Sequence, residues 1–341
     1  MFRSLLPLAC AALLACGGPP AALPSALVST CPDAEVTLQV LGSGDGSGAG
    51  ARSAPAYLVR VAGKARILID AGPGTLLRFH EAGGHLEDLR AVLLTQIELE
   101  HAADLPPLLA AAAQAGRRHP LALVGPGVGL TSMPFSRWLE QLAARDRGLY
   151  PRLNALHEGA GDPFRVAIND VDIDAGAPRV VYADDAVEAL AIGVPHDGAP
   201  SAAYLVRAEG RAIVFAADQR ADTQRFAAMA HDADVLVVHA AITEEPSKEL
   251  ARRFAGPDRL AELARASRAG RLVLGHLTPA TASRIGAITE AMGQIYAGPI
   301  SLARDLDCLV VPARPGAAPP AAPEPTPPAE PAAPQSNRAA A

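Results

Sequence analysis

The stretch that most constrains the fold of this 341-residue chain is residues 93–105, where an apolar run gives way to closely spaced polar side chains. The run ends at residue 95, and the polar residues that follow it are Gln96, Glu98, Glu100 and His101. A helical pattern follows over residues 104–115. This pattern predicts a buried strand that ends in a short loop with its polar side chains gathered at the strand's end. Amide, carboxylate and imidazole donors on such a loop indicate a metal site.

In spacing, residues 95–101 resemble the T-H-x-H-x-D-H signature of the metallo-β-lactamase superfamily. They read Thr-Gln-Ile-Glu-Leu-Glu-His here, so that three of the four ligand positions, Gln96, Glu98 and Glu100, are changed. The order of expected elements from residue 36 to 311 is similar to that superfamily, most of all to its ribonuclease Z and arylsulfatase-like branch. The resemblance implies an α/β (α+β) fold, the four-layer αββα sandwich of two packed sheets with helices outside.

Three later residues match the ligand pattern of the superfamily: His196, Asp218 and His276. In the family one metal is held by both histidines of H-x-H, a later histidine and a bridging aspartate. The other metal is held by the D-H pair, the same aspartate and a final histidine. The resemblance therefore implies a first site made of Gln96, Glu98, His196 and Asp218. It implies a second site made of Glu100, His101, Asp218 and His276.

The two implied sites differ in their donors. A neutral amide oxygen is a poor zinc ligand, so the first site should be weak or empty. The second site keeps two carboxylates and two imidazoles, which suit Zn²⁺. We expect one bound zinc ion. The alternatives are a second metal ion, Mn²⁺ or Fe²⁺ instead of zinc, and a protein that binds no metal. Family metals activate water, and Glu98 or Glu100 is the expected base.

Two further residues, Asp70 and His239, are expected to contact the metal ligands without binding the metal themselves. Asp70 stands in a strand–Asp-x-Gly-x-Gly–helix step, which the family has before its metal loop and in which the aspartate orients that loop. Capping of the following helix is an alternative or additional role for Asp70. His239 sits where the family often has a His-Glu pair, and we expect it to lie behind the ligands at most.

Away from the site, local patterns predict several elements. Hairpins are expected over residues 56–70, around Ala62 and Gly63, and over residues 202–215. One continuous helix is expected from about residue 247 to 268.

The chain ends predict export. Residues 1–15 are typical of a signal peptide, because their apolar run is too short to span a bilayer. The sequence Leu-Leu-Ala-Cys ending at Cys16 resembles the lipobox of bacterial lipoproteins. Lipid on Cys16 and a tether over residues 16–33 would anchor a domain over residues 34–312 to the membrane, with the outer membrane facing the periplasm as the expected place. A soluble periplasmic or secreted protein is the alternative. The Pro- and Ala-rich residues 313–341 should be disordered.

Cysteine usage agrees with export. After processing and lipidation, Cys31 and Cys308 remain. In an oxidising compartment they are expected either to form a disulfide or to stay as two separate buried thiols.

The net charge of the chain limits the kinds of partner that it can bind. The net charge of −6 and the lack of a dense basic cluster argue against a nucleic-acid partner. Two hypotheses remain. One is an exported metal-dependent hydrolase of an ester or phosphodiester bond in an unidentified small molecule. The other is a non-catalytic lipoprotein that uses a decayed hydrolase scaffold for binding. The enzyme is favoured because His196, Asp218 and His276 persist.

Overall fold

The structure is a computed structural model, and it describes residues 31–129, 133–158, 164–243 and 246–313. The expected signal peptide, Cys16 and all but the first residue of the expected tail lie outside this part of the chain. Within the described ranges, no helix combines the length and the apolar character that a membrane crossing requires.

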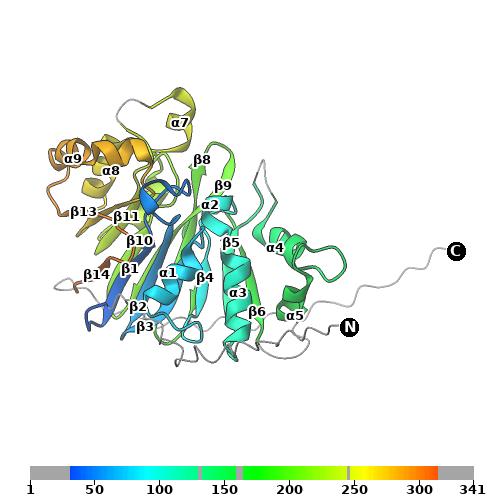
Figure 1. The fold of residues 1–341 in the computed structure, drawn as a ribbon. Coiled ribbons are helices and arrows are strands. Elements are labelled where there is room, and N and C mark those ends of the chain that lie inside the picture. The colour runs from blue at the N-terminus through cyan, green and yellow to red at the C-terminus, as the bar shows by residue number, and fades with distance from the viewer. Residues whose placement is uncertain (1–30, 130–132, 159–163, 244–245, 314–341) are drawn as a thin grey trace, which may run out of the picture.

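Two seven-stranded sheets form the centre of the molecule (Figure 1). The strands of the first sheet are antiparallel from β14 to β3 and parallel from β3 to β6. In spatial order they are β14 (Cys308–Val310), β1 (Val36–Gly42), β2 (Ala56–Val61), β3 (Lys64–Ile69), β4 (Ala91–Leu93), β5 (Leu121–Pro126) and β6 (Val166–Val171).

The second sheet repeats this plan. Its strands are antiparallel from β7 to β10 and parallel from β10 to β13. In spatial order they are β7 (Arg179–Ala183), β8 (Glu188–His196), β9 (Ala199–Ala208), β10 (Arg211–Phe215), β11 (Val235–His239), β12 (Leu272–Gly275) and β13 (Ile300–Leu302). Each sheet thus has parallel strands whose carboxyl ends lie along one edge.

Both expected hairpins are present. The turn between β2 and β3 has φ of 48° at Ala62 and 75° at Gly63, and the turn between β9 and β10 has φ of 49° at Glu209 and 71° at Gly210. Two-residue turns with positive φ at both positions match the twist of the strands that they join. Turn chemistry therefore explains both antiparallel pairings.

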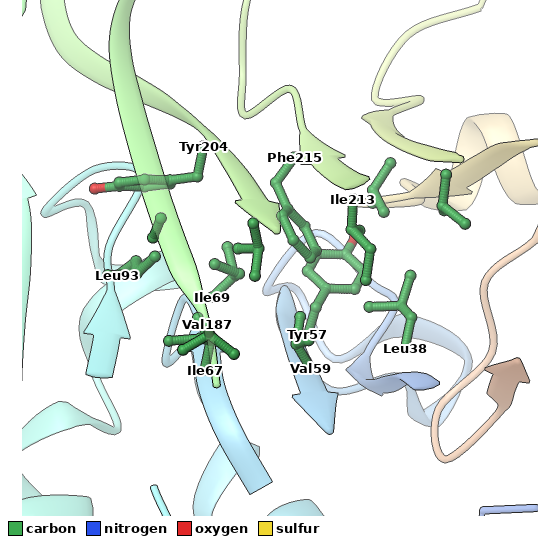
Figure 2. Packing of buried hydrophobic residues seen from close by; sticks show 14 of the residues in the cluster. Leu38, Tyr57, Val59, Ile67, Ile69, Leu93, Val187, Tyr204, Ile213 and Phe215 are labelled. Carbon is green, nitrogen blue, oxygen red and sulfur yellow. The ribbon is translucent and has the colours of Figure 1, made fainter. Parts of the chain in front are cut away.

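The core lies in three layers between and outside the sheets. The inner faces of both sheets pack together through residues such as Leu38, Tyr57, Val59, Tyr204 and Phe215 (Figure 2). A second cluster joins the first sheet to its helices, α1 (Thr75–Glu81), α3 (Leu105–Gln114) and α4 (Phe135–Ala143). A third joins the second sheet to α6 (Gln224–Met229), α8 (Pro257–Ala266) and α9 (Pro279–Gly293). The expected αββα sandwich is confirmed.

The remaining helical segments are short and lie in connections between these layers. They are η1 (Ala49–Ala51), α2 (Leu99–Ala102), η2 (Pro151–Leu153), α5 (Asn154–Glu158) and α7 (Lys248–Arg253).

The expected continuous helix over residues 247–268 is wrong. The structure has α7, which ends at Arg253, and then α8, which begins at Pro257. Proline lacks the N–H that an interior helical position donates, and it disfavours helical backbone at the residue before it. Phe254 is accordingly extended, with φ −126° and ψ 151°. The break matters because Arg253 and Phe254 both contact site residues.

The structure joins Cys31 to Cys308 by a disulfide, and so favours the bridge over two separate thiols. Cys308 begins β14, which pairs with β1. The bridge therefore ties the start of the described chain to the edge strand at its end.

Candidate metal centre

The residues expected at the site lie where parallel strands of both sheets end. Asp70 follows β3, and the loop from Leu94 to Glu98 follows β4. In the second sheet Asp218 lies three residues after β10 and His276 follows β12 directly. Ligand sites in open α/β sheets commonly lie beyond the carboxyl ends of the strands. The topology therefore explains why residues distant in sequence meet here.

Three positions at these strand ends have left-handed backbone conformations. The φ angle is 59° at Asp70, 60° at Ala217 and 52° at His276. Each such residue other than glycine costs of order 1–3 kcal/mol, and such strain is characteristic of functional sites. These sharp turns direct Asp70, Asp218 and His276 inward instead of letting the strands continue.

Asp70 fixes the orientation of His101. Its carboxylate is fully buried and accepts hydrogen bonds from the backbone N–H of Thr95 at 2.7 Å and from the Thr95 hydroxyl at 2.9 Å. Asp70 Oδ2 also lies 2.9 Å from His101 Nδ1, which donates to it. His101 Nε2 therefore points away from Asp70, 3.3 Å from Asp218 Oδ2. Asp70 does not act as a helix cap, since the backbone N–H groups of Gly74 and Leu76 at the start of α1 donate to Asp104 Oδ2 instead.

Asp218 lies at the centre of three imidazoles. Its Oδ1 is 2.6 Å from His239 Nδ1, and its Oδ2 is 3.7 Å from His276 Nε2 and 3.3 Å from His101 Nε2. Burial acts to raise the pKa of Asp218, but His276, His239 and His101 outweigh it and hold the pKa well below its usual range. A buried carboxylate remains charged here because cationic or hydrogen-bonding groups surround it.

The pKa values of His101 and His276 shift in opposite directions. Burial opposes protonation of His101, but Asp70 and Asp218 outweigh it and raise its pKa to about 10. Burial is the largest cause that lowers the pKa of His276 to about 4, and repulsion from His239 and His101 adds to it. His276 is therefore neutral near pH 7, as a metal ligand must be, whereas metal binding at His101 would displace a proton.

Several buried nitrogen atoms at this centre make no hydrogen bond to any described residue, although two of them lie within ion-pair distance of Asp218. His101 Nε2, His276 Nδ1 and His276 Nε2 make no hydrogen bond within the described part of the chain. A buried polar atom without a partner costs about 1–3 kcal/mol, so such atoms are rare and call for an explanation. Convergent nitrogen atoms beside an ionised carboxylate fit a metal ion.

The ligand atoms form two overlapping groups. In each group all atoms lie within 4.8 Å of one another. The first group contains Glu100, His101 and His276, and the second contains Asp218, His239 and His276. Of the four residues expected at the second site, Glu100, His101 and His276 therefore lie in one group, and Asp218 lies in the other group, which shares His276. Nitrogen and carboxylate donors of this kind suit Zn²⁺.

His239 lies nearer the centre than the sequence pattern predicts. It ends β11, and it is in register with Gly275 of the parallel strand β12. Its ring centroid is therefore 4.8 Å from that of His276. Sequence spacing alone could not reveal this contact, because it depends on the pairing of β11 with β12.

Two glycines bring backbone close to Glu100. A Cβ atom at Gly72 would lie 2.0 Å from the Glu100 carbonyl oxygen, and one at Gly46 would lie 2.7 Å from Glu100 Cβ. Gly46 has a φ of 86° and belongs to the glycine-rich loop after β1. This loop therefore packs against the residue that replaces the aspartate of the signature.

The residues expected at the first site are arranged differently. Gln96 Nε2 donates to Asp218 Oδ2 at 2.7 Å. Glu98 accepts hydrogen bonds from Arg253 Nη2 at 3.0 and 3.3 Å. His196 contacts the same nitrogen, with 3.2 Å between His196 Nε2 and Arg253 Nη2. Neither Glu98 nor His196 belongs to the two groups of ligand atoms found among the described residues. The residues present do not fit a metal ion here.

The family model of the beta-lactamase superfamily domain matches residues 65–277, which is more than half of the chain. The chain belongs to this superfamily. A ribonuclease Z from Mycobacterium sp. (strain KMS) is 30% identical over 257 residues, which are 72% of this chain and 84% of the relative. A ribonuclease Z from Pseudomonas putida (strain F1) is 26% identical over 304 residues, 79% of this chain and 95% of the relative. The expected superfamily and its ribonuclease Z branch are confirmed.

Solved structures of the superfamily share the fold at low sequence identity. The metallo-beta-lactamase fold protein YhfI from Bacillus subtilis superposes with a TM-score of 0.63 at 16% identity, covering 80% of this chain and 98% of its own. The short form of human tRNase Z superposes with a TM-score of 0.62 at 18% identity, covering 81% and 99%. A diphosphatase of the PhnP family gives 0.57 at 17% identity, covering 80% and 97%. These likenesses show the sandwich.

Two pockets border the centre in this superfamily member. A pocket of about 390 Å³ reaches His276, and a larger one of about 760 Å³ reaches His196. Phe254 stands between them, with its ring centroid 5.3 Å from His196 and 5.9 Å from His276. Other residues that line the smaller pocket are Asp45, Ile242, Thr243, Leu250 and Thr278. Its lining is mostly apolar with a few polar groups, as is typical of small-molecule sites.

One residue of the site was missed from the sequence. Arg253 contacts both Glu98 and His196, yet its position is not part of the family signature. The available signal was the Gly-Pro pair at residues 256–257, which predicts a helix end just after Arg253. The fold is needed to bring that helix end to the strand ends.

Proposed function

We propose that the chain is a metal-dependent hydrolase that holds one ion with Glu100, His101, Asp218 and His276. The observation that supports this most strongly is the convergence of buried nitrogen atoms of His101 and His276, which make no hydrogen bond within the described ranges, beside the charged Asp218. When bound, the ion would polarise the substrate and lower the pKa of water. Zinc is the proposed metal because the donors are nitrogen and carboxylate oxygen.

The residues of the chain would have distinct roles. Asp70 holds the His101 ring so that Nε2 faces the ion, as a carboxylate behind a histidine ligand does in other metal sites. Of the two expected bases, Glu100 is the better candidate to accept a proton, because Arg253 engages both oxygen atoms of Glu98. Ile242, Leu250 and Phe254 would offer an apolar wall to the part of the substrate that lies in the small pocket.

The proposed substrate is a small ester or phosphodiester, and not a nucleic acid. The pocket of about 390 Å³ beside His276 has the size of a small-molecule site. The net charge of −6 does not favour a polyanionic partner. The ribonuclease activity for which these relatives are named is therefore not proposed for this chain.

The proposed location is the outer membrane, facing the periplasm, with lipid on Cys16; a soluble periplasmic or secreted form is the alternative. The disulfide between Cys31 and Cys308 supports export, because such bridges persist in oxidising compartments. Labelling with radioactive palmitate in a Gram-negative host would test the anchor. Label on the wild type that is absent from Cys16→Ser supports it, and an unlabelled wild type argues for a soluble form.

Metal analysis combined with substrate screening tests the activity. We expect about one equivalent of zinc per chain, lost in His276→Ala, and hydrolysis of bis-p-nitrophenyl phosphate or p-nitrophenyl acetate that chelation abolishes. A protein purified without metal, and unable to bind added zinc, would overturn the proposal. One equivalent of zinc without hydrolysis of either ester would favour the second candidate, a non-catalytic binding module. The engagement of Glu98 and His196 by Arg253 is the observation that favours this second candidate.

A further inference from the structure

The contacts of Arg253 bear on how many metal ions the centre can bind. In the metallo-β-lactamase superfamily, the first metal ion is held at the positions that Gln96, Glu98, His196 and Asp218 occupy in this chain. Two of these residues, Glu98 and His196, contact one nitrogen atom of Arg253, at 3.0 Å and 3.2 Å. A protein cation therefore lies between two residues that a metal ion would have to bring together.

The contact with His196 involves both of its ring nitrogen atoms. His196 Nδ1 lies 2.9 Å from the Arg253 carbonyl oxygen and donates to it. Nε2 must then be the acceptor for Arg253 Nη2, which fixes the tautomer of the ring. The lone pair that a metal would use is directed at the guanidinium. Backbone and side chain of one residue thus hold a nearly fully buried imidazole.

The other two positions are engaged as well. Gln96 is almost fully buried and donates from its amide to Asp218 Oδ2. A guanidinium offers hydrogen-bond donors and no lone pair, so Arg253 can pair with Glu98 and His196 but cannot itself bind a metal ion. Glu98 compensates the charge of Arg253 directly, which explains a carboxylate where the signature has a neutral histidine.

We propose that Arg253 is a resident cation that takes the place of the first metal ion. This inference builds on the one-metal site of the proposed function. Arg253 holds Glu98 and His196 together without a metal, and restricts the centre to one ion, at the second site. It is a positioning residue, and its position at the end of α7 depends on the break before Pro257.

Metal stoichiometry tests this directly, without reference to activity. Zinc equivalents are measured by elemental analysis and by calorimetric titration for the wild type, for Arg253→Ala and for the triple variant Q96H/E98H/R253A. We expect about one equivalent in the wild type and a second, weaker one in Arg253→Ala, where Glu98 and the Nε2 atom of His196 are released. The triple variant regains two histidine ligands and should bind two equivalents tightly.

A matched control is Arg252→Ala, which removes the same charge from the same helix. Arg252 is exposed and pairs with Asp197 at 3.4 Å, so this variant should keep the wild-type number of ions. Melting temperatures measured with and without zinc provide a second test if one of the variants folds poorly. Without metal, Arg253→Ala should melt below the wild type, and zinc should raise its melting temperature by more than it raises that of the wild type.

The outcomes separate this inference from the proposed function. Two tight equivalents in the wild type, or only one in a folded triple variant, would overturn the role of Arg253. No metal in the wild type but one new equivalent in the triple variant would support Arg253 and overturn the one-metal hydrolase. An equal zinc response of Arg252→Ala and Arg253→Ala would assign the effect to general charge and also overturn the role.

Discussion

Asp70 Oδ2 lies 2.9 Å from His101 Nδ1, and both side chains are completely buried. This contact decides which nitrogen of His101 faces the centre. It also ties the end of β3 to α2, because Asp70 accepts two further hydrogen bonds from Thr95 in the loop between β4 and α2. One carboxylate therefore connects the strand, the loop and the imidazole.

Replacing Asp70 by asparagine should weaken metal binding more than it disturbs the fold. The amide keeps the shape but cannot accept all three hydrogen bonds, and it carries no charge to hold the His101 ring. We expect zinc affinity to fall by about 10- to 100-fold and the free energy of unfolding to fall by about 1–3 kcal/mol. Competition with a chelator and urea denaturation measure the two effects.

The matched control is Asp184→Asn. Asp184, like Asp70, accepts three hydrogen bonds, here two from backbone N–H groups and one from the hydroxyl of Tyr182, but none comes from the histidines of the centre. It should lose stability without losing zinc affinity. Equal zinc affinity in Asp70→Asn and the wild type would show that Asp70 does not orient a ligand.

Gly275 is the position where a single methyl group should disturb the centre. An added Cβ would lie 2.0 Å from the Tyr57 hydroxyl oxygen, and Tyr57 is buried between the sheets (Figure 2). Gly275→Ala should therefore lower the free energy of unfolding by about 1–3 kcal/mol. Because His276 follows directly, zinc affinity should fall as well. Urea denaturation and zinc titration check both.

Gly286→Ala is the contrasting substitution. Gly286 lies in the exposed part of α9, and an added Cβ would meet no atom within 4 Å. Alanine should stabilise this helix by about 0.5–1 kcal/mol, with no change in zinc affinity. A Gly275→Ala protein as stable as Gly286→Ala would contradict the close packing against Tyr57.

Much of the fold follows from local sequence. The hairpin around Ala62 and Gly63 and the alternating apolar strands are determined by neighbours in the chain. The strand-end positions of Asp70, Asp218 and His276 follow in the same way, since each comes just after an apolar run. Their convergence needed the resemblance to a known sandwich, because no local pattern specifies which strands are neighbours.

The positions of two residues, His239 and Arg253, could not be predicted from the sequence. The place of His239 depends on the register of β11 with β12, a contact between residues far apart in the chain. The place of Arg253 depends on the helix break and on packing of α7 near β8. Both are tertiary consequences, and neither leaves a periodic trace in the sequence.

The disulfide should stabilise the fold without affecting the centre. Cys31 and Cys308 are separated by 277 positions, so the bridge closes a very long loop. Loss of a native disulfide typically costs about 2–5 kcal/mol. Cys308→Ser, or reduction of the wild type, should lower the denaturant midpoint by a corresponding amount. Zinc affinity should not change, and a reduced protein with unchanged unfolding would show that the bridge contributes nothing to stability.

Zinc should stabilise the folded protein, because its proposed ligands come together only in the native state. At a free zinc concentration of 100 times the dissociation constant, the gain is about 2.7 kcal/mol. For a domain of this size this corresponds to a rise in melting temperature of about 5 °C. His276→Ala should lose this response, because the variant lacks a ligand shared by both groups of donor atoms. His231→Ala serves as the control, since His231 is half exposed and pairs with Asp232 outside these groups. Equal melting shifts in the two variants would mean that zinc binds elsewhere on the protein.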